Sequence, residues 1–214
     1  MRPPAPSLRH PPEAEPERQQ IHAGLVAVCR DHGLCKATVE QVVMRSGLDC
    51  DAFTRHFADL DDCFADYLAD ACGPLFDGAR MAVEGADRWR LQLRGAVYEI
   101  IRFLAADQDR AHMLLVETRA AGPRGSLVRD QAFEEMVDFI DRGRLLMDDP
   151  TALTRVTAEA LAGALVRQLE LLQTDAGLKA AAEVVPQLMY FLVLPYLGQR
   201  AAIEELSKPP PSEA

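Results

Sequence analysis

The chain has 214 residues, of which 49% are hydrophobic, so it is long enough to bury one large core or two smaller ones. It has no run of eighteen apolar residues, and its first twenty residues lack the apolar segment of a signal peptide. We therefore expect a cytoplasmic protein that does not span a membrane. The formal net charge of -10 argues against a protein that coats nucleic acid non-specifically, because acidic surface repels phosphate. Any contact with DNA must be local.

The two ends of the chain predict a flexible arm and a flexible tail. Residues 1–16 contain six prolines and no periodic apolar pattern, so they cannot bury enough surface to become ordered. The tail is expected over residues 207–214. From Arg18 onward apolar residues recur at helical spacing, and no alternating run typical of a strand is present. The sequence predicts an all-α protein.

Two short helices joined by a glycine turn are predicted after a first helix that ends near residue 33. Thr38 is a natural N-cap for a helix that continues through Arg45, and Gln41 completes a capping box. That helix ends at Gly47, a residue suited to a left-handed helix end. Asp49 then offers an N-cap for the second short helix. This pair of helices is the strongest local signal in the sequence.

Longer helices are predicted in the rest of the chain. The expected elements are a helix that Asp59 caps and that Gly73-Pro74 interrupts, a helix over 93–104, a shorter one over 107–119, a loop over 122–125, a helix over 133–140, one that starts at Asp149-Pro150, and a last helix through 184–192. Small residues on the helix after Asp149 and a broad apolar face on the last helix are compatible with a helical dimer interface.

The cysteines point to neither disulfides nor zinc. Their number is odd, they form no CxxC pair, and they lie among apolar positions at helical spacing. We interpret them as reduced core thiols. They are Cys29, Cys35, Cys50, Cys63 and Cys72.

The stretch over residues 38–57 reads TVEQVVMRSGLDCDAFTRHF and resembles the helix-turn-helix of the TetR/AcrR family of transcriptional regulators. The similar features are the threonine, the branched apolar residue after it, the small residue before Gly47, and the closing His56-Phe57. The resemblance covers residues 18–70, and the run LPYLG over 194–198 is similar to the end of many such regulators.

The resemblance implies an N-terminal three-helix helix-turn-helix DNA-binding domain over 17–72 and a larger C-terminal helical ligand-binding and dimerisation domain over 73–206. It implies a homodimer formed through the last two helices, which binds a palindromic operator in double-stranded DNA. The implied function is that of a repressor released by a small apolar ligand. The alternative is a helical ligand-binding or interaction protein on the same scaffold that has lost specific DNA binding.

Several positions depart from the family pattern. Asp51 stands where a glycine is usual, Thr54 where a tyrosine is usual, and Leu60 where a lysine is usual. Residues 18–70 contain five Lys or Arg against nine Asp or Glu, which disfavours phosphate binding, so we expect modest and strongly salt-dependent affinity. Arg2, Arg9 and Arg18 are candidates for further phosphate or minor-groove contacts. The candidate DNA-binding residues are Lys36, Thr38, Arg45, Gly47, Asp49, Cys50, Thr54, Arg55 and His56.

A ligand site is expected where aromatic and flexible apolar residues of the second domain mix with a few polar ones. The candidates are Tyr98, Arg102, Phe103, His112, Met113, Glu117, Phe133, Val137 and Gln168. No second His or Cys lies near His112, so no metal is expected there. The chain has no GxSxG, HExxH, phosphate-binding loop or dinucleotide fingerprint, so we expect no cofactor and no enzyme activity.

Overall fold

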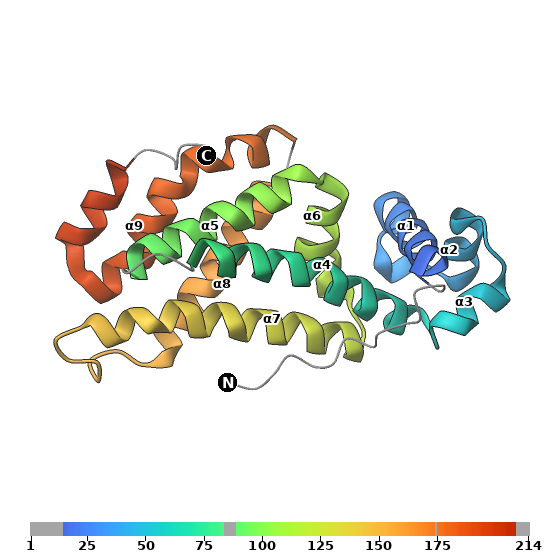
Figure 1. Ribbon diagram of the computed structural model, residues 1–214, viewed down its shortest axis with the longest axis horizontal. Coiled ribbons are helices and arrows are strands. Elements are labelled where there is room, and N and C mark those ends of the chain that lie inside the picture. The colour runs from blue at the N-terminus through green and yellow to red at the C-terminus, as the bar shows by residue number, and fades with distance from the viewer. Residues whose placement is uncertain (1–14, 84–88, 174, 209–214) are drawn as a thin grey trace. The chain divides into compact units, whose positions relative to one another are not determined.

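A computed structural model describes residues 15–83, 89–173 and 175–208 (Figure 1). Within these ranges every regular element is a helix, so the prediction of an all-α protein is confirmed. None of the described helices is long and apolar enough to cross a bilayer. Most of the predicted arm and tail lies outside the described residues. Residues 15 and 16, which the sequence placed in the arm, open the first helix.

The helices follow one another with short connections. In chain order they are α1 (Glu15–His32), the 3-10 turn η1 (Leu34–Lys36), α2 (Val39–Ser46), α3 (Cys50–His56), α4 (Leu60–Val83), α5 (Trp89–Ala106), α6 (Gln108–Leu115), the 3-10 turn η2 (Glu117–Ala120), α7 (Pro123–Asp141), the 3-10 turn η3 (Arg142–Leu146), α8 (Arg155–Leu171) and α9 (Asp175–Leu206).

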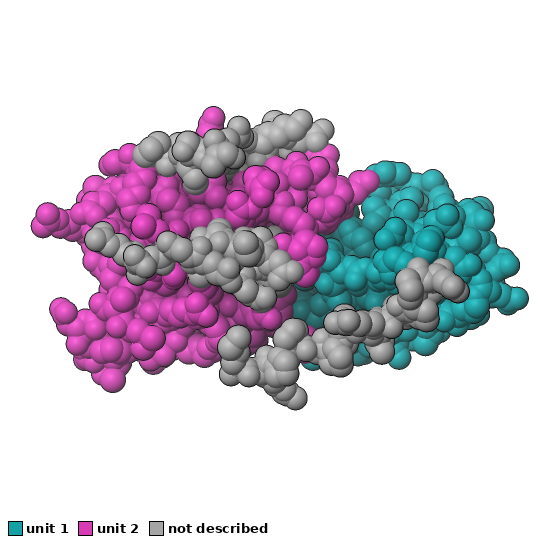
Figure 2. Space-filling view, in the orientation of Figure 1, with its two compact units in different colours: residues 1–72, 112–129 teal, residues 73–111, 130–214 magenta. Residues whose placement is uncertain are grey.

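The chain forms two compact units (Figure 2). The first unit contains residues 1–72 and 112–129, and the second contains residues 73–111 and 130–214. The sequence placed the segment 112–129 in the second domain. In the structure this segment contributes Met113, which is 1% exposed, to the core of the first unit.

The core of the first unit holds α1 directly against α2. Ile21 and Leu25 of α1, Val42 of α2 and Phe53 of α3 are fully buried together. Gly24 makes the close approach possible, since a Cβ added there would lie 2.6 Å from the backbone oxygen of Val42. The two helices that precede the turn therefore form one packed base for α3.

The start of α7 is capped from α4. Asp61 accepts hydrogen bonds from the backbone N–H groups of Arg124 (3.0 Å) and Gly125 (3.2 Å), two of the unpaired donors at a helix start. Gly122 leaves room for that carboxylate, because an added Cβ would lie 2.5 Å from its carbon. The predicted loop over 122–125 is therefore wrong: the helix begins at Pro123, and proline suits a first helical position.

Three other predicted boundaries are corrected. Gly73-Pro74 does not end α4, which continues through Pro74 to Val83. α6 ends at Leu115 rather than near residue 119, and η2 follows it. The helix predicted to start at Asp149-Pro150 starts at Arg155, because the Asp149 carboxylate accepts from the backbone N–H and hydroxyl of Thr151 in a local turn instead.

In the second unit both α5 and α8 pack against α9 (Figure 1). The buried face of α5 includes Leu93, Val97 and Ile101. α9 bends at Gly198, whose φ of 74° lies in the left-handed region. Pro195 lies inside α9, just before this bend.

Candidate nucleic-acid interface

Local side-chain caps build the two short helices. The Thr38 hydroxyl accepts from the backbone N–H of Gln41 (3.3 Å), and the Gln41 side chain accepts from the N–H of Thr38 (3.0 Å). Gly47 has a φ of 73°, and Asp49 accepts from the N–H of Ala52 at 2.7 Å. The predicted capping box, left-handed glycine and second N-cap are all confirmed. Together they give the helix-turn-helix geometry that allows α3 to be presented to a groove.

α3 has one buried face and one exposed face. Ala52 and Phe53 are 2% and 1% exposed and pack into the core of the first unit. Cys50, Thr54 and Arg55 are exposed on the opposite side, and the Thr54 hydroxyl donates to the backbone oxygen one turn earlier. The prediction that the second short helix is exposed is confirmed. We call Cys50, Asp51, Thr54 and Arg55 the outward face of α3.

The exposed arginines near this face are paired with carboxylates of α1. Arg55 contacts Glu17 at 3.1 Å, and Arg45 of α2 contacts Asp31 at 2.5 Å. Lys36, at the end of η1, is also exposed, and no ion pair places it against a carboxylate within the described ranges. Phosphate would have to compete with α1 for both arginines.

His56 lies inside the unit rather than on its rim. Its side chain is 5% exposed and its Nε2 lies 3.0 Å from a Glu17 carboxylate oxygen. Hydrogen bonds from His56 and then Arg55 hold the pKa of the Glu17 carboxyl below its ordinary value. The sequence placed His56 among the DNA contacts, but its buried ring anchors the end of α3 to α1 and is not presented to a groove.

The prediction for Arg18 is also corrected, because this candidate phosphate contact is a buried cation in the structure. Its guanidinium donates to Glu15 (2.8 Å) and Asp66 (2.5 Å) and pairs with Asp70, and its side chain is 8% exposed. His22 Nε2 lies 3.2 Å from Asp66, and its ring stacks on Phe57 at 5.7 Å. These contacts tie α1 to α4 behind α3.

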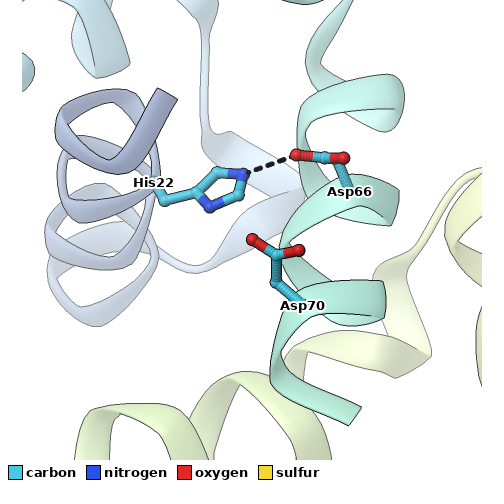
Figure 3. A group of neighbouring side chains, drawn as sticks. All are labelled: His22, Asp66 and Asp70. Atoms are coloured by element: carbon cyan, nitrogen blue, oxygen red, sulfur yellow. Dashed lines mark ion pairs between the residues drawn. The ribbon is translucent and has the colours of Figure 1, made fainter. Parts of the chain in front are cut away.

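His22, Asp66 and Asp70 offer ligand atoms within 4.8 Å of one another (Figure 3). These are residue types that bind zinc. Arg18 already satisfies both carboxylates, so a metal ion could enter only by displacing its guanidinium. Burial raises the pKa of the Asp66 carboxyl, but hydrogen bonds from His22 and Arg18 outweigh burial and leave this pKa below its ordinary value.

Three of the candidate ligand residues belong to the first unit. Met113 packs in its core, and the buried Glu117 carboxylate accepts from the backbone N–H of Leu34 at 2.7 Å. The other Glu117 oxygen lies 2.8 Å from His112 Nε2. These three residues support the segment that leads into the helix-turn-helix, so we remove them from the candidate pocket.

The other candidate ligand residues lie in the second unit, with differing exposure. Val137 is fully buried, whereas Phe103 and Phe133 are half-buried. Arg102, whose side chain is 79% exposed, pairs with Glu99, and Gln168 is exposed on α8. Arg102 and Gln168 therefore lie on the surface, and we remove them from the predicted interior site. Tyr98 is half-buried with a buried hydroxyl.

The cysteines divide into core and surface thiols, so the prediction of five core thiols is only partly right. Cys29 and Cys63 are buried, and burial raises the pKa of the Cys29 thiol to about 12. Cys35 and Cys50 are exposed and Cys72 is intermediate, and all five are free thiols.

No protein-family model and no curated protein matches this sequence. Solved structures do match its fold. The fatty acid degradation regulator FadR from Bacillus halodurans is 18% identical, with a TM-score of 0.69 over 83% of this chain and 95% of that one. A TetR family transcription regulator from Marinobacter aquaeolei is 13% identical, with a TM-score of 0.64 over 85% of this chain and 95% of that one.

FadR from Bacillus subtilis, solved in complex with stearoyl-CoA, is also 13% identical, with a TM-score of 0.63 over 84% of this chain and 98% of that one. The chain therefore has the all-α fold of these transcriptional regulators along most of its length.

Proposed function

We propose that this protein is a TetR-family transcriptional regulator, a repressor that binds a palindromic operator as a homodimer and is released by a small apolar ligand. One observation carries the proposal: the capped α2–turn–α3 element presents an exposed helix face on the fold that these regulators share. Cytoplasmic location follows from this function.

In the proposed complex the outward face of α3 lies in the major groove. Thr54 and Cys50 reach base edges, and Lys36, Arg45 and Arg55 contact phosphates. Because Asp31 and Glu17 hold the two arginines in the free protein, part of the phosphate energy is used to replace those ion pairs. Binding is therefore modest and strongly dependent on salt.

Selection from a random-sequence duplex library with the intact protein tests this proposal. Enrichment of one palindromic sequence at moderate salt supports the repressor, and uniform, negligible recovery of all duplexes refutes it. Asp31→Asn frees Arg45 and is expected to raise affinity for the enriched duplex about two- to fivefold. The control is Glu135→Gln, an exposed position of the second unit that removes the same charge and is expected to change nothing.

The proposed dimer forms through α8 and α9. Val156 and Leu171 of α8 are 65% and 57% exposed, and Phe191 of α9 is 39% exposed. A Cβ added at Gly163 of α8 would meet nothing within 4 Å, so a partner helix has room to approach. Such exposed apolar side chains beside a small residue favour a helical interface.

Light scattering after size-exclusion chromatography tests the interface. Val156→Glu and Phe191→Glu are expected to convert dimer to monomer, because each would bury a charge in the proposed interface. Leu127→Glu is the control, since this α7 residue is 59% exposed and belongs to the first unit. A wild-type monomer at micromolar concentration contradicts the proposal.

Ligand release is proposed to act through α6, which begins in the second unit and ends in the first. The segment that follows it holds the start of η1 through the Glu117 contact with Leu34. A ligand that shifts α6 would thereby disturb the support of the helix-turn-helix and change the separation of the two recognition helices. In Glu117→Ala, ligand binding is expected to lower the affinity for DNA less than it does in the wild-type protein.

The alternative is a helical ligand-binding protein on this scaffold without specific DNA binding. One observation favours it: both exposed arginines near α3 are already neutralised by carboxylates. Under this alternative the duplex selection recovers nothing while ligand binding persists.

A further inference from the structure

Asp51 is an exposed residue in the first turn of α3, on the outward face of this helix. Thr54 and Arg55 follow three and four residues later, so the three side chains share one side of the helix. Ala52 and Phe53 are buried in the core on the other side. In a helix-turn-helix the first residues of the second helix contact base edges. In the proposed complex Asp51 therefore faces the bases rather than the core.

The Asp51 carboxylate makes no hydrogen bond and no ion pair within the described part of the chain. Asp49 differs, because its carboxylate accepts from the backbone N–H of Ala52 at 2.7 Å and caps α3. The natural partner of Asp51 is Arg55, since Asp and Arg four residues apart can pair on a helix surface. Arg55 instead contacts Glu17 of α1 at 3.1 Å. The fold thus leaves a hydrogen-bond acceptor on the outward face that no donor of the described residues satisfies.

The edges of the four bases differ in what they offer a carboxylate in the major groove. Guanine presents two acceptors there, and thymine presents one acceptor and a methyl group, so both disfavour Asp51. Adenine and cytosine each carry an amino donor. Adenine N6 lies beside the acceptor N7 of the same base, which repels the second carboxylate oxygen, whereas N4 is the only polar group that cytosine presents. Cytosine therefore compensates best for bringing this charge close to the phosphates.

We propose that Asp51 is a specificity-determining residue, whose carboxylate accepts a hydrogen bond from the N4 amino group of one cytosine in each half-site of the operator. This inference rests on the DNA-binding part of the proposed function and names a base that the same site recognises. Asp51 adds no affinity for phosphate, so its effect is on the choice of sequence. It favours a cytosine at that position and disfavours the other three bases by leaving its charge without a donor.

Selection from the random-sequence duplex library with wild type, Asp51→Ala and Glu40→Ala tests the proposal. Glu40 is the matched control, because it is an exposed carboxylate at the second position of α2, as Asp51 is in α3. Wild type and Glu40→Ala are expected to enrich the same palindrome, with cytosine at one fixed position of each half-site. Asp51→Ala is expected to keep the other positions and to accept any base at this one. Both variants lose one negative charge, so both are expected to bind unrelated duplexes slightly more tightly.

A modified base tests the hydrogen bond itself. N4-methylcytosine still pairs with guanine, but a methyl group replaces the amino hydrogen that points into the major groove. This base, placed at the fixed position of one half-site, is expected to weaken wild-type binding about tenfold and to leave binding by Asp51→Ala unchanged. Because Asp51 is exposed, Asp51→Ala is expected to unfold thermally as wild type does, so that a change in binding reports on the DNA contact.

Enrichment of the same palindrome by wild type and Asp51→Ala overturns the proposal and leaves Asp51 as a solvated charge that only repels phosphate. Equal weakening of both proteins by N4-methylcytosine overturns it as well, because the methyl group then acts without the carboxylate. The two failures can be told apart. Recovery of no duplex by any of the three proteins refutes the proposed function and this contact with it, whereas a palindrome that is the same for all three refutes the Asp51 contact alone.

Discussion

Replacing Arg18 with methionine tests how the base beneath α3 is held together. The substitution keeps an unbranched apolar stem and removes the guanidinium that joins α1 to Asp66 and Asp70 of α4. The chain then keeps a largely buried Asp66 carboxylate, 22% exposed, that has lost its strongest donor. His22 remains beside it as a possible donor.

The expected loss of unfolding free energy follows from the burial of each partner. Removal of one member of a fully buried ion pair costs about 3–5 kcal/mol. Glu15 and Asp70 are 41% and 47% exposed, so water replaces much of what they lose. Their contribution is at most that of a surface pair, about 1 kcal/mol or less. Because Asp66 is only partly shielded from water, we expect a total of about 2–3 kcal/mol for Arg18→Met.

Urea denaturation followed by circular dichroism measures this loss. The control is Arg30→Met on the same helix, where the side chain is 56% exposed and lies 3.7 Å from Asp31, and its cost should stay within about 0.5 kcal/mol. The double variant Arg18→Met/Asp66→Asn should lose less than the sum of the two single variants, because no buried charge is left unpaired. If Arg18→Met costs no more than Arg30→Met, the guanidinium does not hold α1 to α4 and the reasoning fails.

Three more predictions concern the same unit. Gly24→Ala should destabilise the protein by about 1–3 kcal/mol in urea denaturation, because the new Cβ would lie 2.6 Å from a backbone oxygen of α2. The control is Ala23→Gly at the exposed neighbouring position, which should cost only about 1 kcal/mol through its lower helix propensity. A Gly24→Ala variant more stable than wild type would contradict the close packing of α1 on α2. Because folding lowers the pKa of the Asp66 carboxyl, this group stabilises the fold fully above its unfolded pKa of about 3.9, and the stabilisation is lost as the pH falls through the folded pKa. Urea midpoints measured from pH 6 to about 3 should therefore fall less steeply for Asp66→Asn than for wild type. Parallel curves for the two proteins would refute this prediction. Cys50 is exposed, so in the free protein it should react with N-ethylmaleimide, and the enriched duplex should protect it from this reaction. The buried Cys29, whose thiol pKa is raised, should stay unlabelled with and without duplex, and peptide mass spectrometry would show both results. Equal labelling of Cys50 with and without duplex would exclude this residue from the interface.

Features that depend on residues a few positions apart were predictable from the sequence. The Thr38–Gln41 capping box, the left-handed Gly47 and the Asp49 cap are each complete within four residues, so their patterns are visible in the chain itself. Periodicity likewise revealed the buried faces of α1 and α5.

Features that depend on distant partners were not predictable. The Asp61 carboxylate caps a helix that starts more than sixty residues later, and this contact turned an expected loop into the first turn of α7. Glu17 lies 39 residues from His56, so no local pattern indicated that this histidine is buried. Long-range pairing of this kind is a property of the packed fold, and a single sequence does not display it.

A buried ion pair that sequence reasoning missed has the same origin. Arg94 is a charged residue on the buried stripe of α5, at the spacing of Val97 and Ile101. That position was a usable signal, because a charge on an apolar face is seldom buried without a partner. Its partner Glu205 lies 111 residues away, and only the structure brings the two together.

If the outward face of α3 reads DNA, removing a side chain from that face should change which base pairs the protein prefers. Thr54→Ala changes an exposed side chain whose hydroxyl donates to the Asp51 backbone oxygen of its own helix, so the fold should be unaffected. Binding of wild type and variant is measured to the enriched duplex and to the same duplex with single base-pair changes. Thr54→Ala is expected to lose discrimination of about 1–3 kcal/mol at one position in each half-site while its thermal unfolding stays unchanged. Identical discrimination by the two proteins at every position would contradict it.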